Sequence, residues 1–355
     1  MEDTLLTARR LYVNETADRA DGVDMSIALW CYVWPLIFVV GVSGNTLILL
    51  VLRRGGYGKT SASVYLWLLA AADSFVLAFG FVDGYLRHAW HFAITDSSAV
   101  ACRLIWFLQP GLATTAIWIL VAFTVERFMG VCFPMRPLQT ARQAYVIAAA
   151  LMVAALLKNT DTLYTIAPRD DDVHTCMVSP TYTDYEDYVR PWIGFTLTSL
   201  LPFVAILFCN ISIIRALRSR AINALVPPAA NHHVAQTTVM CVSVSFVFLA
   251  CYSPGSVVTL AGGYWRVSSV TFSAVERDVV TVTACLRYVH HSVNIFLYCL
   301  TGAQFRKDLR ALCRGLPATL RWSRTGGAVR RMCSRAVTSL SPSTPPSRDS
   351  CVTLV

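Results

Sequence analysis

Residues 64–81 read VYLWLLAAADSFVLAFGF, and Asp73 is the only charged residue among them. A helix that packs one face against a soluble core shows a polar stripe with a period of 3.6 residues. This stretch shows almost none, and neither does the stretch of residues 239–251. A helix of about 20 apolar residues is long enough to cross the roughly 30 Å of hydrocarbon in a bilayer. Residues 64–81 therefore predict a membrane-spanning helix.

Stretches of the same kind recur along the chain. Of its 355 residues, 55% are hydrophobic and only 14% are charged, whereas soluble domains carry about 25% charged residues. The predicted spans are residues 27–52, 63–88, 101–132, 144–166, 192–217, 234–262 and 277–300. We therefore expect an all-α membrane protein in which residues 27–300 form a seven-transmembrane helix bundle.

The distribution of basic residues predicts the orientation of this bundle. Arginines and lysines gather in the first, third and fifth links between spans and in the C-terminal tail, whereas acids gather in the other links. The positive-inside rule places the C-terminus in the cytoplasm and the N-terminus outside the plasma membrane. We assign the net charge of +9 to this topology and to a tail that faces anionic membrane lipid, and not to nucleic-acid binding.

The N-terminal segment, residues 1–26, is polar and lacks the apolar core of a cleavable signal peptide. We expect it to be extracellular. Asn14 begins the tripeptide Asn-Glu-Thr, which is a sequon for N-glycosylation.

A short amphipathic eighth helix is predicted for residues 301–314. Phe305, Leu309 and Leu312 recur at helical spacing with basic residues between them, a pattern typical of a helix that lies on the inner membrane surface. Cys313 near its end is a candidate for palmitoylation.

The remaining residues, 315–355, are rich in Arg, Ser, Thr and Pro and predict a disordered cytoplasmic tail. Its serines and threonines are candidate phosphorylation sites for the recruitment of arrestin. The chain ends in Thr353-Leu354-Val355, in which Thr353 and Val355 fit the pattern that PDZ grooves capture by strand addition.

Short motifs follow one another in order along the predicted spans. They are Gly44-Asn45 in the first span, Leu69-Ala70-Ala71-Ala72-Asp73 in the second, Trp90-His91-Phe92 in the link after it, Glu126-Arg127-Phe128 at the end of the third, Pro202 in the fifth, Cys251-Tyr252-Ser253-Pro254 in the sixth and Asn294-Ile295-Phe296-Leu297-Tyr298 in the seventh. Together they resemble the rhodopsin-like (class A) G protein-coupled receptors over about residues 40–312. Within that family the chain looks most like peptide receptors of the FMRFamide or neuropeptide type. The resemblance implies a receptor, not an enzyme, that binds an extracellular ligand and activates heterotrimeric G proteins.

The resemblance also implies roles for individual residues. Cys102 and Cys176 would form the disulfide that pins the outer loop over the bundle. The triplet Glu126, Arg127 and Phe128 would couple to the G protein, with Glu126 neutralising Arg127 at rest. Residues 234–238, near the inner end of the sixth span, carry no acid, so we expect Glu126 to restrain Arg127 nearly alone.

A set of interior residues would form the activation switch, and a second set a buried polar cluster. The switch needs helices that can adopt two arrangements, and prolines weaken helices locally because they remove backbone hydrogen bonds. The polar cluster is expected because polar residues inside spans normally face the bundle interior in pairs. The switch residues are Ile117, Pro202, Phe248, Tyr252, Pro254, Asn294 and Tyr298, and the cluster residues are Asn45, Asp73, His290, His291 and Asn294.

Several positions depart from the family pattern. Tyr252 replaces the usual tryptophan of the sixth span, and Ile295 replaces the proline of the seventh. Where the family often holds a sodium ion beside Asp73, this chain has His290 and His291, and an imidazole can hydrogen-bond that carboxyl group. We therefore expect weak modulation by sodium.

The ligand is predicted from the charges near the outer ends of the spans. Gln109 stands where amine receptors carry an aspartate, which disfavours a monoamine, and no lysine lies in the seventh span to bind retinal. The link over residues 168–190 is acidic, and an acidic rim attracts cationic ligands. We expect a basic peptide, with Asp83, Gln109, Asp184, Glu186, Asp187, Tyr252 and Tyr288 as the candidate ligand-binding residues.

Other function classes fit the sequence less well. A non-peptide small molecule or a lipid remains the alternative ligand. A transporter would show internal repeats and more charges inside its spans, but only Asp73, Asp83, Lys158 and Asp161 are deep enough to line a path. An intramembrane enzyme would need a constellation of catalytic side chains within the spans. We expect no cofactor and no metal.

Overall fold

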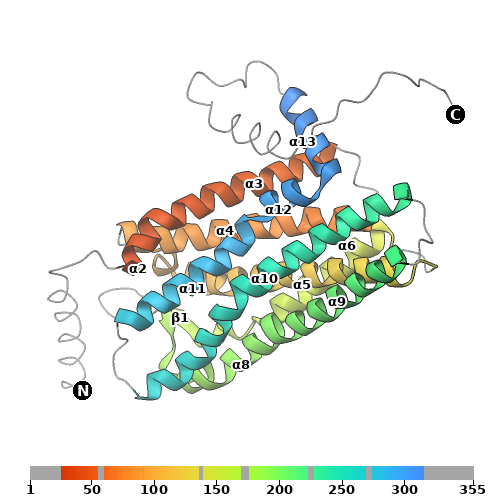
Figure 1. Ribbon diagram of the computed structural model, residues 1–355. Coiled ribbons are helices and arrows are strands. Elements are labelled where there is room, and N and C mark those ends of the chain that lie inside the picture. Colours follow the sequence, from red (N-terminus) through yellow and green to blue (C-terminus); the bar gives the residue numbers. More distant parts are fainter. Residues whose placement is uncertain are drawn as a thin grey trace, which may run out of the picture.

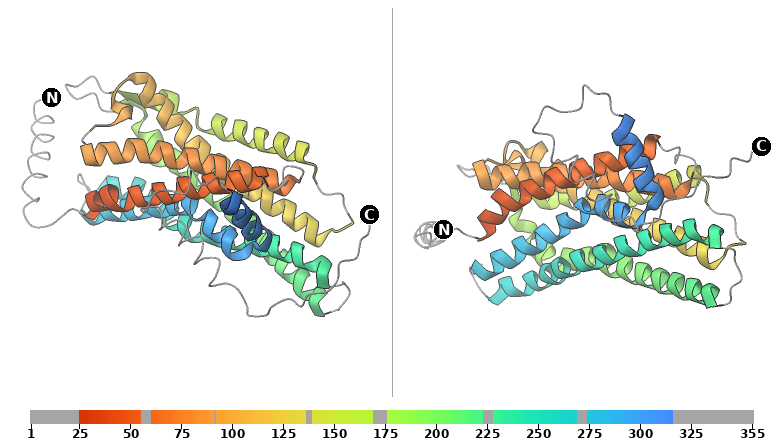
Figure 2. Two further views of the ribbon diagram at one scale, coloured as in Figure 1. Left: turned by 90° about the horizontal axis from the view of Figure 1, so that it is seen from above. Right: turned by 45° about the horizontal axis from the view of Figure 1, so that its top comes forward.

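The computed structural model describes residues 25–54, 60–90, 92–135, 139–168, 176–222, 228–268 and 274–315. Long helices run side by side along the length of the molecule (Figures 1 and 2). From α3 to α6, each helix packs against the next one along the chain. This arrangement confirms the predicted all-α, seven-transmembrane bundle.

The first half of the bundle contains four long helical segments. They are α2 (Met25–Ala28), η2 (Leu29–Val33) and α3 (Trp34–Arg54) in one run, then α4 (Ser61–Trp90), α5 (Ala99–Cys132) and α6 (Ala141–Lys158). The fourth predicted span extended to residue 166, but the helix stops at Lys158. The Asn159 side chain bonds the carbonyl of Ala155, and the Asp161 side chain accepts from the backbone N–H of Thr162. Such local bonds compete with helix continuation, and a short helix, α7 (Thr162–Thr165), follows.

In the second half, the fifth and seventh helical segments are built from several shorter helices. The fifth segment is built from η6 (Tyr185–Val189), α8 (Arg190–Phe195), η7 (Thr196–Leu200) and α9 (Leu201–Ile222), and the sixth is the single helix α10 (Pro228–Ser268). The π-helical turn η7 lies directly before Pro202, whose missing N–H removes one helical bond. The seventh segment is divided into α11 (Ala274–Ser292) and α12 (Asn294–Thr301).

Six of the described helices are long and apolar enough to cross a membrane. The seventh segment fails this criterion because α11 carries Glu276, Arg277, Asp278 and Arg287 and because the helix is interrupted after Ser292. It nevertheless packs between α3 and α10, where a seventh helix closes the bundle.

One end of the bundle carries a small β-hairpin. Strand β1 (Ile166–Pro168) pairs antiparallel with β2 (Cys176–Val178). Cys176 forms a disulfide with Cys102 at the start of α5, as predicted. We call this end of the molecule the disulfide end.

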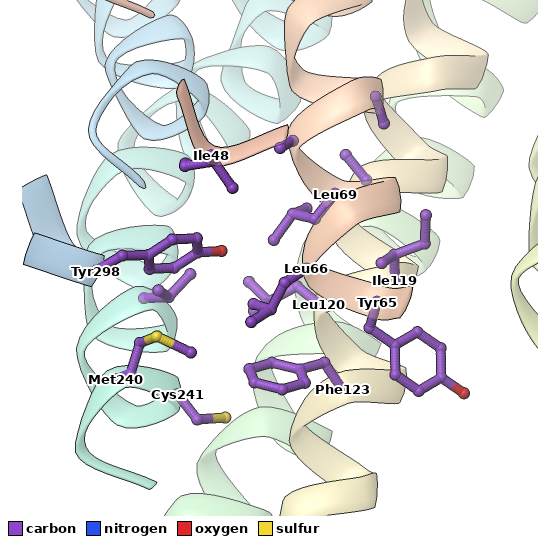
Figure 3. Packing of buried hydrophobic residues seen from close by; sticks show 14 of the residues in the cluster. Ile48, Tyr65, Leu66, Leu69, Ile119, Leu120, Phe123, Met240, Cys241 and Tyr298 are labelled. Carbon is purple, nitrogen blue, oxygen red and sulfur yellow. The ribbon is translucent and has the colours of Figure 1, made fainter. Parts of the chain in front are cut away.

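The apolar core lies toward the opposite end, which we call the Arg127 end. Figure 3 shows Met240 and Cys241 of α10 facing Phe123 of α5, with Tyr298 of α12 close by. Phe123, Tyr298 and Cys241 are each 1% exposed or less. Because this core joins α5, α10 and α12, a shift of any of these helices must repack the others.

The predicted eighth helix is α13 (Ala303–Gly315), which lies at an angle to α3 at the Arg127 end (Figures 1 and 2). Phe305, Leu309 and Leu312 are buried in this single chain, and the Phe305 ring meets that of Tyr298 edge-on, with ring centres 5.7 Å apart. The helix thus covers the core instead of resting only on lipid.

Candidate functional site

An ion pair between neighbouring residues marks the Arg127 end. An Oε1 atom of Glu126 lies 2.9 Å from the Arg127 guanidinium, and the Glu126 side chain is only 1% exposed. The hydroxyl of Ser61, at the start of α4, donates to the same Glu126 oxygen. In the part of the chain that the structure describes, Glu126 is the one carboxylate in contact with Arg127.

Aromatic rings complete the surroundings of this pair. The Arg127 guanidinium lies 5.8 Å from the centre of the Phe123 ring, within the range of a cation–π contact. Phe128 instead faces sideways, and its ring lies near those of Phe133 and Phe208. Glu126 and Arg127 therefore form one unit, and Phe128 belongs to the packing between α5 and α9.

A chain of hydrogen bonds crosses the middle of the bundle and is centred on Asp73. His291 Nδ1 lies 2.6 Å from one Asp73 oxygen, and the Asn294 amide donates to the other, also at 2.6 Å. The amide of Asn45 donates to the backbone carbonyl of His291 at 3.0 Å. Asp73 is fully buried, so α3, α4, α11 and α12 are joined by bonds that water does not weaken.

Tyr252 of α10 extends this chain. Its hydroxyl lies 2.9 Å from His291 Nε2. In the tautomer with the proton on Nδ1, His291 donates to the Asp73 carboxylate and its Nε2 accepts from the Tyr252 hydroxyl. Both Asp73 oxygens then accept hydrogen bonds from the protein itself. Asp73 is the residue beside which we expected only weak modulation by sodium.

His290 lies beside this chain without joining it. Its ring meets those of Phe248, Tyr252 and His291 edge-on. Among the described residues neither of its ring nitrogens has a hydrogen-bond partner. Four of the five predicted cluster residues, Asn45, Asp73, His291 and Asn294, are thus hydrogen-bonded together, and the fifth is in ring contact only.

The predicted switch residues occupy the interior around this cluster. Ile117, Phe248 and Tyr298 belong to one apolar core cluster and are each 1% exposed, with Tyr252 in the same cluster. Pro202 is buried at the start of α9, whereas Pro254 lies within α10, which stays continuous through it. The residues are therefore assembled at the crossing of α5, α9, α10 and α12.

A cavity of about 330 Å³ opens at the disulfide end. Residues of α6, η6, α8, α10 and α11 line it, and Tyr252 contributes to its wall. Arg190 holds two carboxylates on this wall, with Nε 3.3 Å from Asp161 and a terminal nitrogen 2.7 Å from Glu186. The Tyr185 hydroxyl also donates to Asp161, and the Thr165 hydroxyl to Glu186. Tyr252 therefore belongs both to the cavity and to the chain that ends at Asp73.

The predicted ligand-binding residues are only partly brought together. Glu186, Asp187 and Tyr252 line the cavity. Gln109 and Tyr288 lie outside that lining and bond each other, with the Gln109 amide donating to the tyrosine hydroxyl at 2.6 Å.

Two of the predicted acids lie elsewhere. Asp83 accepts from the backbone and hydroxyl of Thr95 and lies 3.7 Å from Arg87, so its carboxylate is held by its own chain. Asp184 is exposed and does not line the cavity.

Sequence reasoning missed the most unusual residue of the cavity wall, which is Arg287 of α11. The interpretation that only Asp73, Asp83, Lys158 and Asp161 lie deep in the spans was wrong, because Arg287 lies inside the predicted seventh span. A single arginine within an apolar stretch was the available signal. Lys158 and Asp161, which were considered only as a transport path, also line the cavity.

Several predicted sites lie outside the described residues. They are Asn14, the acids of residues 170–172, and Thr353 and Val355 together with the rest of the tail. Cys313 is described, and its side chain is exposed in the last turn of α13.

Comparisons with known proteins agree with this geometry. The family model "7 transmembrane receptor (rhodopsin family)" matches residues 44–298. Somatostatin receptor type 1 of Rattus norvegicus and that of Mus musculus are each 27% identical to this chain over 302 residues, which cover 81% of this chain and 72% of the receptor. Somatostatin receptor type 4 of Rattus norvegicus is 26% identical over 309 residues, which cover 84% and 77%. Because the family model matches more than half of the chain, this protein belongs to the rhodopsin family of seven-transmembrane receptors.

Proposed function

We propose that this receptor binds a basic peptide at the disulfide end and that binding activates a heterotrimeric G protein at the Arg127 end. The observation that carries the proposal is the position of Tyr252, which lines the cavity and bonds His291, the partner of Asp73. A ligand that displaces Tyr252 acts on the bonds that hold α4, α10, α11 and α12 together. Interfaces of this kind are bistable and can transmit a small shift over a distance.

At the other end, the response would be the release of Arg127. With Glu126 as its one carboxylate partner in the described chain, a change in the packing of α5 and α10 would free the guanidinium to meet the G protein. The basic links and tail support a cytoplasmic position for this end and an extracellular position for the disulfide end, in a receptor of the plasma membrane.

The class of ligand is supported by the relatives and by the rim. The relatives are receptors for somatostatin, a peptide, whereas the sequence favoured receptors of the FMRFamide or neuropeptide type; both are peptide receptors. Asp187 lines the cavity, and Asp184, three residues before it, is exposed, so a basic side chain would meet carboxylates on entry.

A non-peptide small molecule is the second candidate ligand. The cavity volume of about 330 Å³ lies at the lower end of the range for small-molecule sites, roughly 300–1,000 Å³. A peptide would place only its end in this space, and the remainder would contact the β-hairpin and the rim.

The other partners follow from the sequence pattern. Phosphorylated tail residues would recruit arrestin, Thr353 and Val355 would bind a PDZ protein, and Asn14 would carry a glycan. Cys313 is exposed on α13, as palmitoylation requires, and the acyl chain would fix this helix to the membrane lipid.

The experiment is a screen of basic peptides, as C-terminal amides and as C-terminal acids, on membranes from cells that express the full chain, with guanine-nucleotide exchange as the readout. We expect hits whose potency falls when Asp184 and Asp187 are both changed to Asn. Asp308→Asn, on α13 at the other end, is the matched control and should leave the potency unchanged. If only non-peptide compounds activate the receptor, the second candidate ligand is favoured. Peptides whose potency is the same in the wild type and in the double variant would show that Asp184 and Asp187 do not attract the ligand.

A further inference from the structure

Six charged side chains line the cavity, namely Lys158, Asp161, Glu186, Asp187, Arg190 and Arg287. Arg190 of α8 forms ion pairs with Asp161, in the turn after α6, and with Glu186 of η6. Arg287 extends from a different helix, α11, and also lines the cavity. The cavity therefore has two carboxylates that Arg190 neutralises and, on α11, a cation that lies outside this group of ion pairs.

Arg287 lies against a glycine of the neighbouring helix. A Cβ atom added at Gly255 of α10 would lie 3.3 Å from both Cδ and Nε of Arg287, which is a tight contact. The glycine thus leaves room for the guanidinium group beside α10, level with Ser256 and close to Tyr252, which also line the cavity. The arginine is half-buried and held in place by packing.

The charge of Arg287 is not matched within the described chain. Arg87, Arg127 and Arg190 each contact a carboxylate, but Arg287 makes neither a hydrogen bond nor an ion pair with any described residue. The neighbouring hydroxyls are used elsewhere, since Ser256 donates to the carbonyl of Tyr252 and Thr259 to that of Gly255. A cation in this position inside a membrane bundle is costly unless a partner supplies the opposite charge.

We propose that Arg287 binds a carboxylate of the ligand. The planar guanidinium group offers a fork of donors that matches a carboxylate in bidentate geometry. The inference rests on the proposed peptide receptor and adds polarity to its ligand: basic side chains meet the rim, and a carboxylate enters the cavity. That carboxylate is either the free C-terminus of the peptide or an acidic side chain near its end.

The cavity volume supports a chain end at this position. About 330 Å³ accommodates one or two residues of a peptide but not its whole length. A carboxylate paired with Arg287 would lie beside Tyr252, so the same contact would act on the residue that bonds His291. Binding at Arg287 and activation are thereby coupled through adjacent groups.

The first test needs neither the natural ligand nor a G protein. The full-length receptor, purified in detergent, is heated with N-acetyltyrosine or with N-acetyltyrosinamide, both at millimolar concentration. We expect the acid to raise the melting temperature and the amide to raise it less. The difference should disappear in Arg287→Gln, remain in weaker form in Arg287→Lys, and reverse toward the amide in Arg287→Glu. Equal effects of the two probes on the wild-type receptor, or an unchanged difference in Arg287→Gln, would overturn the proposal.

The second test separates this inference from the proposed function. Peptides from the screen are resynthesised as C-terminal acids and C-terminal amides, each with and without Asp and Glu. If the carboxylate is the C-terminus, the amides should lose on the order of tenfold in potency on the wild-type receptor and nothing on Arg287→Gln. If it is a side chain, removal of Asp and Glu should have that effect instead. Active peptides whose potency is independent of both changes would refute the Arg287 contact and leave the peptide receptor standing.

Discussion

The two ends of this receptor hold their buried charges in different ways. At the disulfide end, Arg190 contacts both Asp161 and Glu186, and each carboxylate also accepts a hydroxyl bond. At the other end, Arg127 contacts Glu126, which in turn accepts from Ser61. Each charge of the Arg190 network has several partners, whereas Arg127 and Glu126 form a single ion pair.

This difference matches the work that each end would do. A network with several partners for each charge keeps its shape when one bond is lost, which suits a cavity that must remain formed before its ligand arrives. A pair with one partner responds fully when that partner moves, which suits the output of a switch. The Asp73 chain lies between them and links the helices of both ends.

We expect the largest loss of stability when the Cys102–Cys176 disulfide is removed from the disulfide end. Replacing both Cys102 and Cys176 with serine removes a cross-link over a sequence separation of 74 residues. The free energy of unfolding should fall by about 3–5 kcal/mol, measured as the thermal denaturation of the purified receptor. Cys313→Ser, which changes an exposed free thiol, is the control. If the double variant is as stable as the control, the cross-link is not what holds this end.

A smaller effect is expected from the chain that joins the two ends. Asp73→Asn places an amide where His291 and Asn294 both donate, so at least one buried donor loses its acceptor. The free energy of unfolding should fall by about 1–3 kcal/mol, and the response to any agonist should weaken. Ser253→Ala, which removes an exposed hydroxyl bonded within its own helix, serves as control. A stable variant with unchanged signalling would disconnect the two ends.

We expect the smallest loss of stability from a single change in the ion-pair network of Arg190, Asp161 and Glu186. In Glu186→Gln the amide oxygen can still accept from Thr165, and Arg190 keeps Asp161, so the loss of stability should be under about 1 kcal/mol. Adding Asp161→Asn removes the second carboxylate, and the double variant should lose more than the sum of the single losses. Additive losses would mean that the two carboxylates do not substitute for each other.

The bundle could be predicted from the sequence because membrane spans are recognisable as long stretches of apolar residues with few charges. The sequence could not predict that the fourth helix ends at Lys158, since this depends on local side-chain bonds of Asn159 and Asp161. The disulfide was predicted from the resemblance, and its position is confirmed.

The lining of the cavity was harder to predict because charge pairing depends on the tertiary structure. Asp83 looked like a free anchor in the sequence, but Arg87 and Thr95 hold it in the fold. Arg190 ends the acidic link of residues 168–190, and in the fold it forms ion pairs with Glu186 of that link and with Asp161 outside it. Arg287 gained its meaning only when Gly255 and the cavity were seen beside it.

We propose that Glu126 restrains Arg127 in the absence of ligand, and basal nucleotide exchange measures this restraint. In Glu126→Gln the side chain keeps its size and can still accept from Ser61, but the negative charge beside Arg127 is gone. Without ligand, exchange on a G protein in membranes should rise by about fivefold or more over the wild-type receptor, and Glu126→Gln combined with Arg127→Ala should return it to background. Basal exchange in Glu126→Gln equal to that of the wild type, at equal receptor density, would show that Glu126 does not restrain Arg127.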